Sequence, residues 1–206
     1  MANHQTSPNR QKILEHFDRN DLRIATIIRN IGPFKLKRNR GHFQVLCKAI
    51  IAQQISTQAA QAVTERFFHL FNGRLPTPDL VFSQSAEKLR SAGLSRQKAS
   101  YLKDLSKHFI EKSIQPNRFP YLSNEEIIQH LTAVHGIGRW TAKMFLIFSL
   151  NRLNILPIED LGLQIAIKKI YQLKKMPSAI KIRKLAQPWS PYETIATWYC
   201  WRTLDT

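Results

Sequence analysis

The sequence predicts an all-α fold, because apolar residues recur at helical spacing and no stretch shows the alternating pattern of a β-strand. Leu, Ile and Ala, with Lys and Gln between them, fall at intervals of three and four, and only seven glycines occur. Hydrophobic residues make up 43% of the chain, which argues against general disorder. The length of 206 residues suits one substantial domain or two small lobes.

The first part of the chain predicts helices separated by short polar segments. Residues 1–20 are polar, so we expect them to run openly before a first helix at 22–31, which Gly and Pro end. A basic loop at 35–40 either contacts phosphates or is a solvated charge run. Apolar residues at 43–50 then follow the i, i+3, i+4, i+7 pattern of a helix. Ser56 or the threonine after it is a suitable cap for the next helix.

Capping residues locate the helices of the middle of the chain. A turn is expected at 73–78, and a short helix at 86–91 is followed by Gly93, a plausible C-cap. Ser95 is expected to cap another helix, and prolines mark the linker after it. The run S-N-E-E at 123–126 is a capping box and begins the next helix.

The last third predicts two more helices around a basic stretch. One helix is expected from Leu161 to about Leu173, followed by a lysine- and arginine-rich segment without an acid until Glu193. The rigid turn W-S-P-Y at 189–192 leads into a final helix that is rich in aromatic residues.

The formal net charge of +17 favours a polyanionic partner, either nucleic acid or an anionic membrane surface. No apolar run approaches the ~18 residues that a membrane-spanning helix needs. The N-terminus lacks the apolar core of a signal peptide. We therefore expect a cytoplasmic, nucleoid-associated protein that binds nucleic acid.

The two cysteines, Cys47 and Cys200, both lie in apolar helical segments and are expected to be buried thiols. Two cysteines exclude a four-cysteine iron–sulfur cluster. The absence of CxxC and HxxxH pairs argues against a zinc site, so no metal ligand is assigned from the residues.

A glycine turn at 135–138, H-G-I-G, joins two expected helices and is a candidate anion site. Glycines permit backbone angles that a Cβ disfavours and allow another backbone to approach. The first amides of the second helix lack acceptors within that helix and favour a phosphate. A purely structural helix corner explains a lone G-x-G equally well.

Two carboxylates, Glu159 and Asp160, follow in a proline-led loop and precede the acid-free basic stretch. Asp160 is suited to capping the helix that begins at Leu161. A carboxylate can also stabilise the positive charge that develops on a deoxyribose as its base departs, and can orient water. The two roles are compatible.

Several motifs together resemble the helix–hairpin–helix DNA glycosylase superfamily, and most closely its 3-methyladenine DNA glycosylase II branch. The resemblance extends from Leu22 to Arg202 and keeps the order of the family's motifs. The matching runs are AIIAQQIS at 49–56, LRSAGLSRQKASYL at 89–102, GIGRWTAKM at 136–144, PIEDLGL at 157–163 and WSPYETIATWYCWR at 189–202.

The resemblance implies a two-lobed helical fold with a central cleft, into which a damaged nucleotide is flipped from duplex DNA. It implies one helix–hairpin–helix glycosylase domain over residues 1–206, with lobes of roughly 35–130 and of 1–34 plus 131–206. A larger bacterial relative carries an extra N-terminal sheet domain, for which this chain has no room before its first matched helix.

The resemblance also implies roles for individual residues. Asp160 matches the catalytic aspartate, with Glu159 as the runner-up. Trp198 and Tyr199 match the terminal aromatic pair, and these two with Trp140 are candidates for the base pocket, or else are core residues.

The backbone of the DNA is expected to bind at the hairpin, through residues in and just after its glycine turn. Arg139 either contacts phosphate or is an exposed residue at the start of a helix. The candidate residues for this contact are Gly136, Ile137, Gly138, Arg139 and Thr141.

The side chain that fills the gap left by the flipped base is expected at Gln53 or Gln54. Some relatives have an apolar residue there, so its identity stays open. No cofactor is expected, apart from a structural monovalent cation that relatives often hold on carbonyls of the hairpin.

Relatives that also cleave the strand carry a lysine at the position of Trp140, and Lys143 does not match it. We therefore predict a monomeric, monofunctional hydrolase that acts in base excision repair on damaged double-stranded DNA. Its substrates would be alkylated purines of the 3-methyladenine and 7-methylguanine class. The alternatives are a non-enzymatic helix–hairpin–helix DNA-binding protein and, more weakly, a glycosylase/lyase that uses Lys143.

Overall fold

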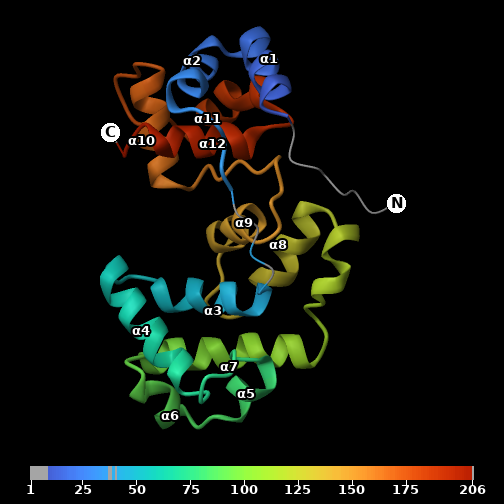
Figure 1. Cartoon of the computed structure of the whole chain (residues 1–206), viewed down its shortest axis with the longest axis vertical. Coiled ribbons are helices and arrows are strands. Elements are labelled where there is room, and N and C mark those ends of the chain that lie inside the picture. Colours follow the sequence, from blue (N-terminus) through green and yellow to red (C-terminus); the bar gives the residue numbers. More distant parts are fainter. Residues whose placement is uncertain (1–8, 37–38, 40, 206) are drawn as a thin grey trace. The chain divides into compact units, whose positions relative to one another are not determined.

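The structure is a computed structural model that describes residues 9–36, 39 and 41–205. Throughout these residues the regular elements are the α-helices α1 to α12 and the 3₁₀-helices η1 and η2, and no strand occurs (Figure 1). The predicted all-α fold is therefore confirmed.

The chain forms two compact units. The terminal unit comprises Met1–Arg38 and Leu146–Thr206, and the central unit comprises Asn39–Phe145. The sequence placed the C-terminal end of the central lobe near residue 130, whereas in the structure the central unit extends to Phe145 and includes the glycine hairpin. The reason is local, because side chains of the central unit bind the hairpin directly, as described below.

The terminal unit brings helices from both ends of the chain together, drawn in blue and in orange to red in Figure 1. One continuous core lies between them, in which Phe17, Ile28 and Trp189 are fully buried. The helices of this unit are α1 Arg10–Asn20, α2 Leu22–Ile31, α10 Leu161–Ile170, α11 Ala179–Ala186, η2 Gln187–Trp189 and α12 Glu193–Arg202.

Asp21 ties the two chain ends of the terminal unit together. Its Oδ1 accepts the α2 amides of Arg23 at 3.2 Å and Ile24 at 3.4 Å. Its Oδ2 accepts the indole N–H of Trp189 at 2.9 Å and the hydroxyl of Tyr171. Burial, together with this carboxylate, raises the pKa of Tyr171. One side chain therefore caps a helix and holds two segments that are distant in sequence.

The central unit is a second helical assembly, with α5 and α6 packed on α7 and α3 packed on α4. An aromatic cluster joins α3, η1 and α9, with Phe119 and Phe145 5.6 Å apart and His42 edge-on to both. The helices are α3 His42–Ala52, α4 Thr57–His69, α5 Pro78–Ser83, α6 Ala86–Ser91, α7 Arg96–Ile110, η1 Pro116–Tyr121, α8 Asn124–Thr132 and α9 Arg139–Phe148, which continues into the terminal unit.

The predicted N-caps are confirmed, whereas the C-cap of α6 is Ala92, one residue before the predicted Gly93. The hydroxyls of Ser56 and Ser95 accept amides of α4 and α7, at 3.2 and 3.1 Å. Ser123 and Glu126 form the predicted reciprocal capping box. Cys47 and Cys200 are the buried free thiols that the sequence predicted, and burial raises the pKa of both.

The prediction that residues 1–20 run openly was wrong for Arg10–Asn20, which form α1. The Asn9 side chain accepts the Gln11 amide at 3.0 Å and caps this helix. Ile13 and Phe17, one helical turn apart, are buried on the core. These two residues, with the partly buried Leu14, thus secure a helix whose other residues are polar.

Three further boundaries differ from the prediction. The basic segment after α10 contains α11, because Ser178 caps it and Ile182 and Ala186, one helical turn apart, are buried while its lysines are exposed. The turn predicted at 73–78 passes directly into α5, whose first residue is Pro78. Helix α10 ends at Ile170, three residues before the predicted Leu173. Within the basic loop predicted at 35–40, residues 37, 38 and 40 lie outside the described residues.

Among the helices that the structure describes, none combines the length and the apolar character needed to cross a membrane.

We predict that Asp21→Ala lowers the free energy of unfolding by about 3 kcal/mol or more. The change removes a helix cap, leaves the Tyr171 hydroxyl without its carboxylate acceptor and leaves the buried indole of Trp189 with only its longer bond, 3.3 Å, to the Tyr171 hydroxyl. Urea unfolding measures the loss. Asp18→Ala is the matched control, since it removes only the exposed pair with Arg29 and is expected to cost less than about 1 kcal/mol. Equal losses in the two variants would contradict this account.

Candidate functional site

The hairpin between α8 and α9 is shaped around Gly136. This glycine has φ +85°, a left-handed conformation that favours glycine. The ring of Tyr101, on α7, occupies the place of a side chain, because a Cβ on Gly136 would lie 2.1 Å from it. The fold itself therefore requires glycine at this position.

Asp104, also on α7, binds the hairpin through His135. Its Oδ2 accepts the backbone N–H of His135 at 2.8 Å and lies 2.9 Å from Nδ1 of the same residue. Burial acts to raise the pKa of Asp104, but the hydrogen bonds from His135 and the electrostatic influence of His108 hold it below its ordinary value. The charged carboxylate therefore fixes the start of the turn.

The turn after α3 is connected to the same hairpin. The side-chain amide of Gln53 donates to the carbonyl of Gly136 at 2.7 Å. Lys98 donates to the carbonyls of Ile51 and Gln53, both at 2.7 Å, and burial lowers its pKa. Gln54 is exposed and has φ +56°, in the left-handed region that is unfavourable for residues other than glycine. The structure thus fixes Gln53 and presents Gln54.

The hairpin amides fall into two groups. The N–H of Ile137 donates to Val134 at 3.1 Å and closes the turn. The amide of Ala142 donates to the carbonyl of Gly138 at 3.0 Å and begins the hydrogen-bond pattern of α9, whose N-terminus favours anions through the helix dipole. Ile137, expected among the phosphate-binding residues, therefore uses its amide within the turn. The candidate position for an anion is therefore the N-terminus of α9, beginning at Gly138.

Gly138 differs from Gly136, because it does not adopt the unusual backbone angles that glycine permits. Its φ is not in the left-handed region, and a Cβ there would meet no atom within 4 Å. The fold thus tolerates a larger residue at this position. Glycine gives a second molecule room to approach the backbone.

The positively charged side chains in the first turn of α9 are engaged or buried. Arg139 forms a bidentate ion pair with Glu125 of α8, at 2.8 and 2.9 Å, and this pair joins the two helices of the motif. The side chains of Thr141 and Lys143 are buried, at 7% and 9% exposure. Trp140 is 45% exposed. Backbone amides, rather than charged side chains, therefore distinguish this position.

In the terminal unit, Asp160 is the N-cap of α10 as predicted. Its Oδ1 accepts the amide of Leu163 at 2.7 Å and the indole N–H of Trp201 at 2.7 Å. Asp160 is partly buried, whereas Glu159 is exposed. Both donors act on one carboxylate oxygen, so they fix the orientation of the group.

Trp201 is itself held in place by its neighbours. Its ring stacks on Phe148, with centroids 5.8 Å apart and an interplanar angle of 17°. Gly162 gives the pair room, because a Cβ there would lie 3.2 Å from Oδ1 of Asp160 and 3.3 Å from Cδ1 of Trp201. The carboxylate, the indole and the glycine form one compact cluster within the terminal unit.

The two base-pocket candidates of the terminal unit, Trp198 and Tyr199, are buried and make the contacts of core residues. Trp198 is 8% exposed, packs edge-on against Phe34 and has the Arg202 guanidinium 5.1 Å from its ring centroid. Tyr199 is 1% exposed, and its hydroxyl donates to the carbonyl of Gly32 at 2.6 Å. Burial raises the pKa of Tyr199. The structure gives Tyr199 a packing role.

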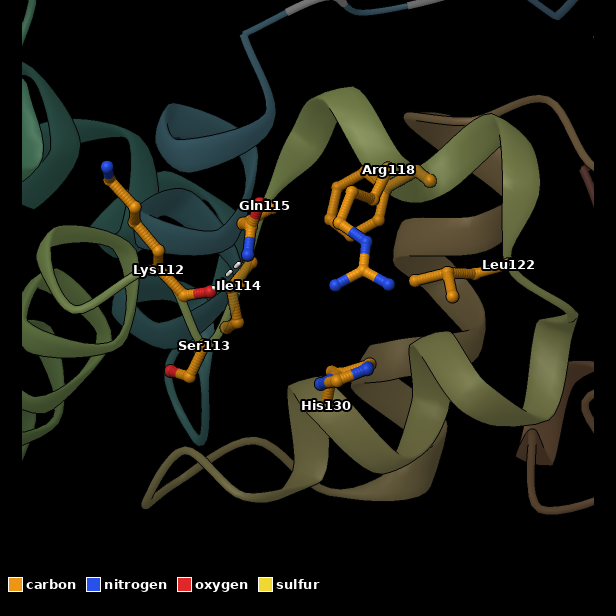
Figure 2. A pocket seen from close by; sticks show the side chains of 8 residues that line it. Lys112, Ser113, Ile114, Gln115, Arg118, Leu122 and His130 are labelled. Atoms are coloured by element: carbon orange, nitrogen blue, oxygen red, sulfur yellow. Dashed lines mark hydrogen bonds between the residues drawn. The ribbon is translucent and has the colours of Figure 1, made fainter.

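A shallow pocket in the central unit is lined by none of the hairpin residues. Figure 2 shows the guanidinium of Arg118 and the ring of His130 on facing walls, with Lys112 at its edge. All three side chains belong to exposed residues. The pocket is therefore part of the basic surface rather than an enclosed binding site.

Sequence reasoning missed the residues that hold the candidate groups, chiefly Trp201, Tyr101, Asp104 and Lys98. Each acts across a long sequence separation, such as the 41 positions between Trp201 and Asp160. The only available signal was that a partly buried tryptophan needs an acceptor for its indole N–H. That signal does not identify the acceptor.

Comparisons with known proteins agree on one family. A model described as "HhH-GPD superfamily base excision DNA repair protein" matches residues 47–191. DNA-3-methyladenine glycosylase 1 of Schizosaccharomyces pombe is 34% identical over 192 residues, which are 92% of this chain and 84% of that protein.

Two solved structures are similar over almost the whole chain. A DNA-3-methyladenine glycosidase from Bacillus halodurans has a TM-score of 0.87 at 33% identity, covering 98% of this chain and 91% of that one. The Schizosaccharomyces pombe 3-methyladenine DNA glycosylase Mag1, in complex with abasic DNA, has a TM-score of 0.82 at 32% identity, covering 95% and 97%.

The two hairpin glycines yield a matched pair of variants. We predict that Gly138→Ala lowers the free energy of unfolding by less than about 1 kcal/mol but weakens binding to duplex DNA about tenfold, because its methyl group blocks the approach of a phosphate. Gly136→Ala is expected to destabilise the fold, since its methyl group collides with Tyr101. Thermal unfolding and fluorescence anisotropy measure the two effects. Unchanged DNA affinity in Gly138→Ala would refute the backbone contact.

Proposed function

Because the chain belongs to the HhH-GPD superfamily of base excision DNA repair proteins, we propose that it is a monofunctional DNA glycosylase. Its substrates are alkylated purines of the 3-methyladenine and 7-methylguanine class, which it flips from duplex DNA before hydrolysing the N-glycosidic bond. The relatives of 32–34% identity, all named for 3-methyladenine, support this substrate class. The observation that carries the proposal is the fixed carboxylate of Asp160 in a strongly basic chain.

Asp160 is the proposed catalytic residue. As the bond from C1′ to the base breaks, its electrons pass to the base and the sugar gains positive charge. The nearby carboxylate stabilises that charge and orients the water whose oxygen bonds to C1′. The water's proton passes to the carboxylate or to solvent, leaving an abasic site.

The chemistry of the leaving group explains why one carboxylate suffices. A purine alkylated at N3 or N7 carries a positive charge and departs as a neutral molecule. It needs no general acid to protonate it. An electron-rich aromatic face further favours a cationic base over a neutral one, by about 0.5–2 kcal/mol.

Among the aromatic candidates for the base pocket, exposure favours Trp140. It is 45% exposed, whereas Trp198 and Tyr199 are 8% and 1% exposed. Contact of Trp198 with a base would require the Arg202 guanidinium to leave its ring. We therefore propose Trp140 for stacking, with Trp198 as a second candidate.

The hairpin is the proposed clamp for the DNA backbone. The amide of Gly138, at the N-terminus of α9, would bind a phosphate without regard to base sequence. In the turn after α3, Gln53 is engaged with the hairpin, so the exposed Gln54 is the proposed residue that fills the gap left by the flipped base.

The hairpin also suits the structural monovalent cation that the family resemblance implies. Carbonyl oxygens have two lone pairs, and those of Val134 and Gly136, which accept from the Ile137 amide and the Gln53 side chain, are the carbonyls proposed to hold it. We further propose that the protein works as a monomer on double-stranded DNA. A chromosomal substrate would place it in the cytoplasm, associated with the nucleoid.

The non-enzymatic alternative, a helix–hairpin–helix DNA-binding protein, explains the charge and the hairpin equally well. It assigns no chemical role to the Asp160 carboxylate that Leu163 and Trp201 hold in one orientation. Release of methylpurine from methylated duplex DNA by the wild-type protein decides between them. DNA binding without any release would leave only the binding protein.

We predict that Asp160→Asn lowers the single-turnover rate of methylpurine release by about 100-fold or more while DNA affinity stays within about threefold. Glu159→Gln, which changes the exposed neighbouring carboxyl in the same way, is expected to keep the rate within about threefold. Chromatography of the released base measures both variants. The assignment fails if Glu159→Gln is the slow variant, or if Asp160→Asn retains nearly normal turnover.

The absence of lyase chemistry is a separate prediction. Lys143 is 9% exposed and its charge acts on the Glu125 carboxylate, so it is poorly placed to attack a sugar. We expect no covalent complex when borohydride is added to the protein with an abasic duplex, and no strand cleavage in a denaturing gel. A trapped complex that Lys143→Arg abolishes would support the glycosylase/lyase alternative.

A further inference from the structure

We propose that Trp201 is a positioning residue for Asp160, whose indole N–H holds the carboxylate in the orientation that base release requires. The proposal rests on the function proposed above, because it assigns Asp160 to the reaction. It adds a residue on α12 to the catalytic machinery. Trp201 acts through Asp160 and has no contact with substrate in this account.

The geometry of the two donors carries the proposal. Leu163 and Trp201 belong to different helices, α10 and α12, and each donates to Oδ1 of Asp160 at 2.7 Å. Such bonds to an ionised carboxylate are stronger than bonds between neutral groups. One donor alone leaves the carboxylate able to turn about its bond to Cβ, and the second donor restricts that rotation.

A helix cap does not need this second donor. The N-cap role of Asp160 is complete with the amide of Leu163. Two further features place the indole near the start of α10. Trp201 stacks on Phe148, and Gly162 has no side chain that would crowd the indole. The cluster is therefore more elaborate than capping requires.

The chain contains a second indole–carboxylate pair that serves as an internal comparison. Asp21 caps α2, and Oδ2 of that residue accepts the indole N–H of Trp189 at 2.9 Å. Trp189 is fully buried, and the pair holds the core of the terminal unit. The same chemistry thus occurs once in a structural setting and once at the proposed catalytic carboxylate.

The test compares Trp201→Phe with Trp189→Phe. Phenylalanine keeps an aromatic ring but removes the N–H donor in both cases. For Trp201→Phe we expect the single-turnover rate at saturating enzyme to fall about tenfold or more, with half-saturation by DNA unchanged. For Trp189→Phe we expect a lower unfolding temperature and an unchanged rate. A normal rate in folded Trp201→Phe overturns the proposal.

A double-mutant cycle separates positioning from a general effect on the fold. In the Asp160→Asn background the positioned charge is already absent, so adding Trp201→Phe should slow release by no more than about twofold. If the two changes multiply fully, Trp201 acts independently of Asp160 and the proposal is wrong.

Gly162→Ala provides a second variant in case Trp201→Phe does not fold. Its methyl group would press on both Asp160 and Trp201, while alanine has the higher helix propensity. We expect slower release with stability and DNA affinity retained, and an unchanged rate contradicts the proposal. If the wild type releases no base, the proposed function fails and this inference with it. If Asp160→Asn is slow while folded Trp201→Phe and Gly162→Ala are normal, only this inference fails.

Discussion

The hydrogen bonds that converge on Oδ1 of Asp160 are the interaction on which the proposed chemistry depends. A chain with 31 lysines and arginines and 14 acids attracts DNA broadly, and such attraction has no chemical selectivity. Catalysis needs one negative group in a defined orientation. As the N-cap, Asp160 holds this carboxylate at the start of α10, and the hydrogen bond from Trp201 connects it to α12. The same contacts that stabilise the helix start therefore orient the carboxylate.

The central unit solves a different problem, which is to present backbone amides to another molecule. Tyr101, Asp104 and Gln53 each bind one part of the turn, and Gly136 fits because it has no side chain. These contacts determine the path of the chain into α9. Gly138 then leaves the surface open where the internal contacts end. A rigid turn beside an open amide is suited to holding a phosphate independently of sequence.

Local patterns predicted most of the fold, because helix periodicity and caps such as Ser95 and Ser123 depend on residues three or four positions apart. Prediction failed at α1 and α11, where only two residues of each helix are buried and secure it on the core. The candidate groups Asp160 and Gly138 were identified from sequence. Their partners were not, because Trp201 meets Asp160 only through the packing of α10 against α12. Burial of Tyr199 likewise depends on tertiary structure.

The most direct test of the account is a single-turnover time course with a duplex that contains one 3-methyladenine. Free base and strand breaks are measured in the same samples for the wild type and Asp160→Asn. The account predicts that the wild type releases base and leaves both strands intact, and that the variant binds the duplex but releases base at least about 100-fold more slowly. Equal release by the two proteins would contradict the central role of Asp160.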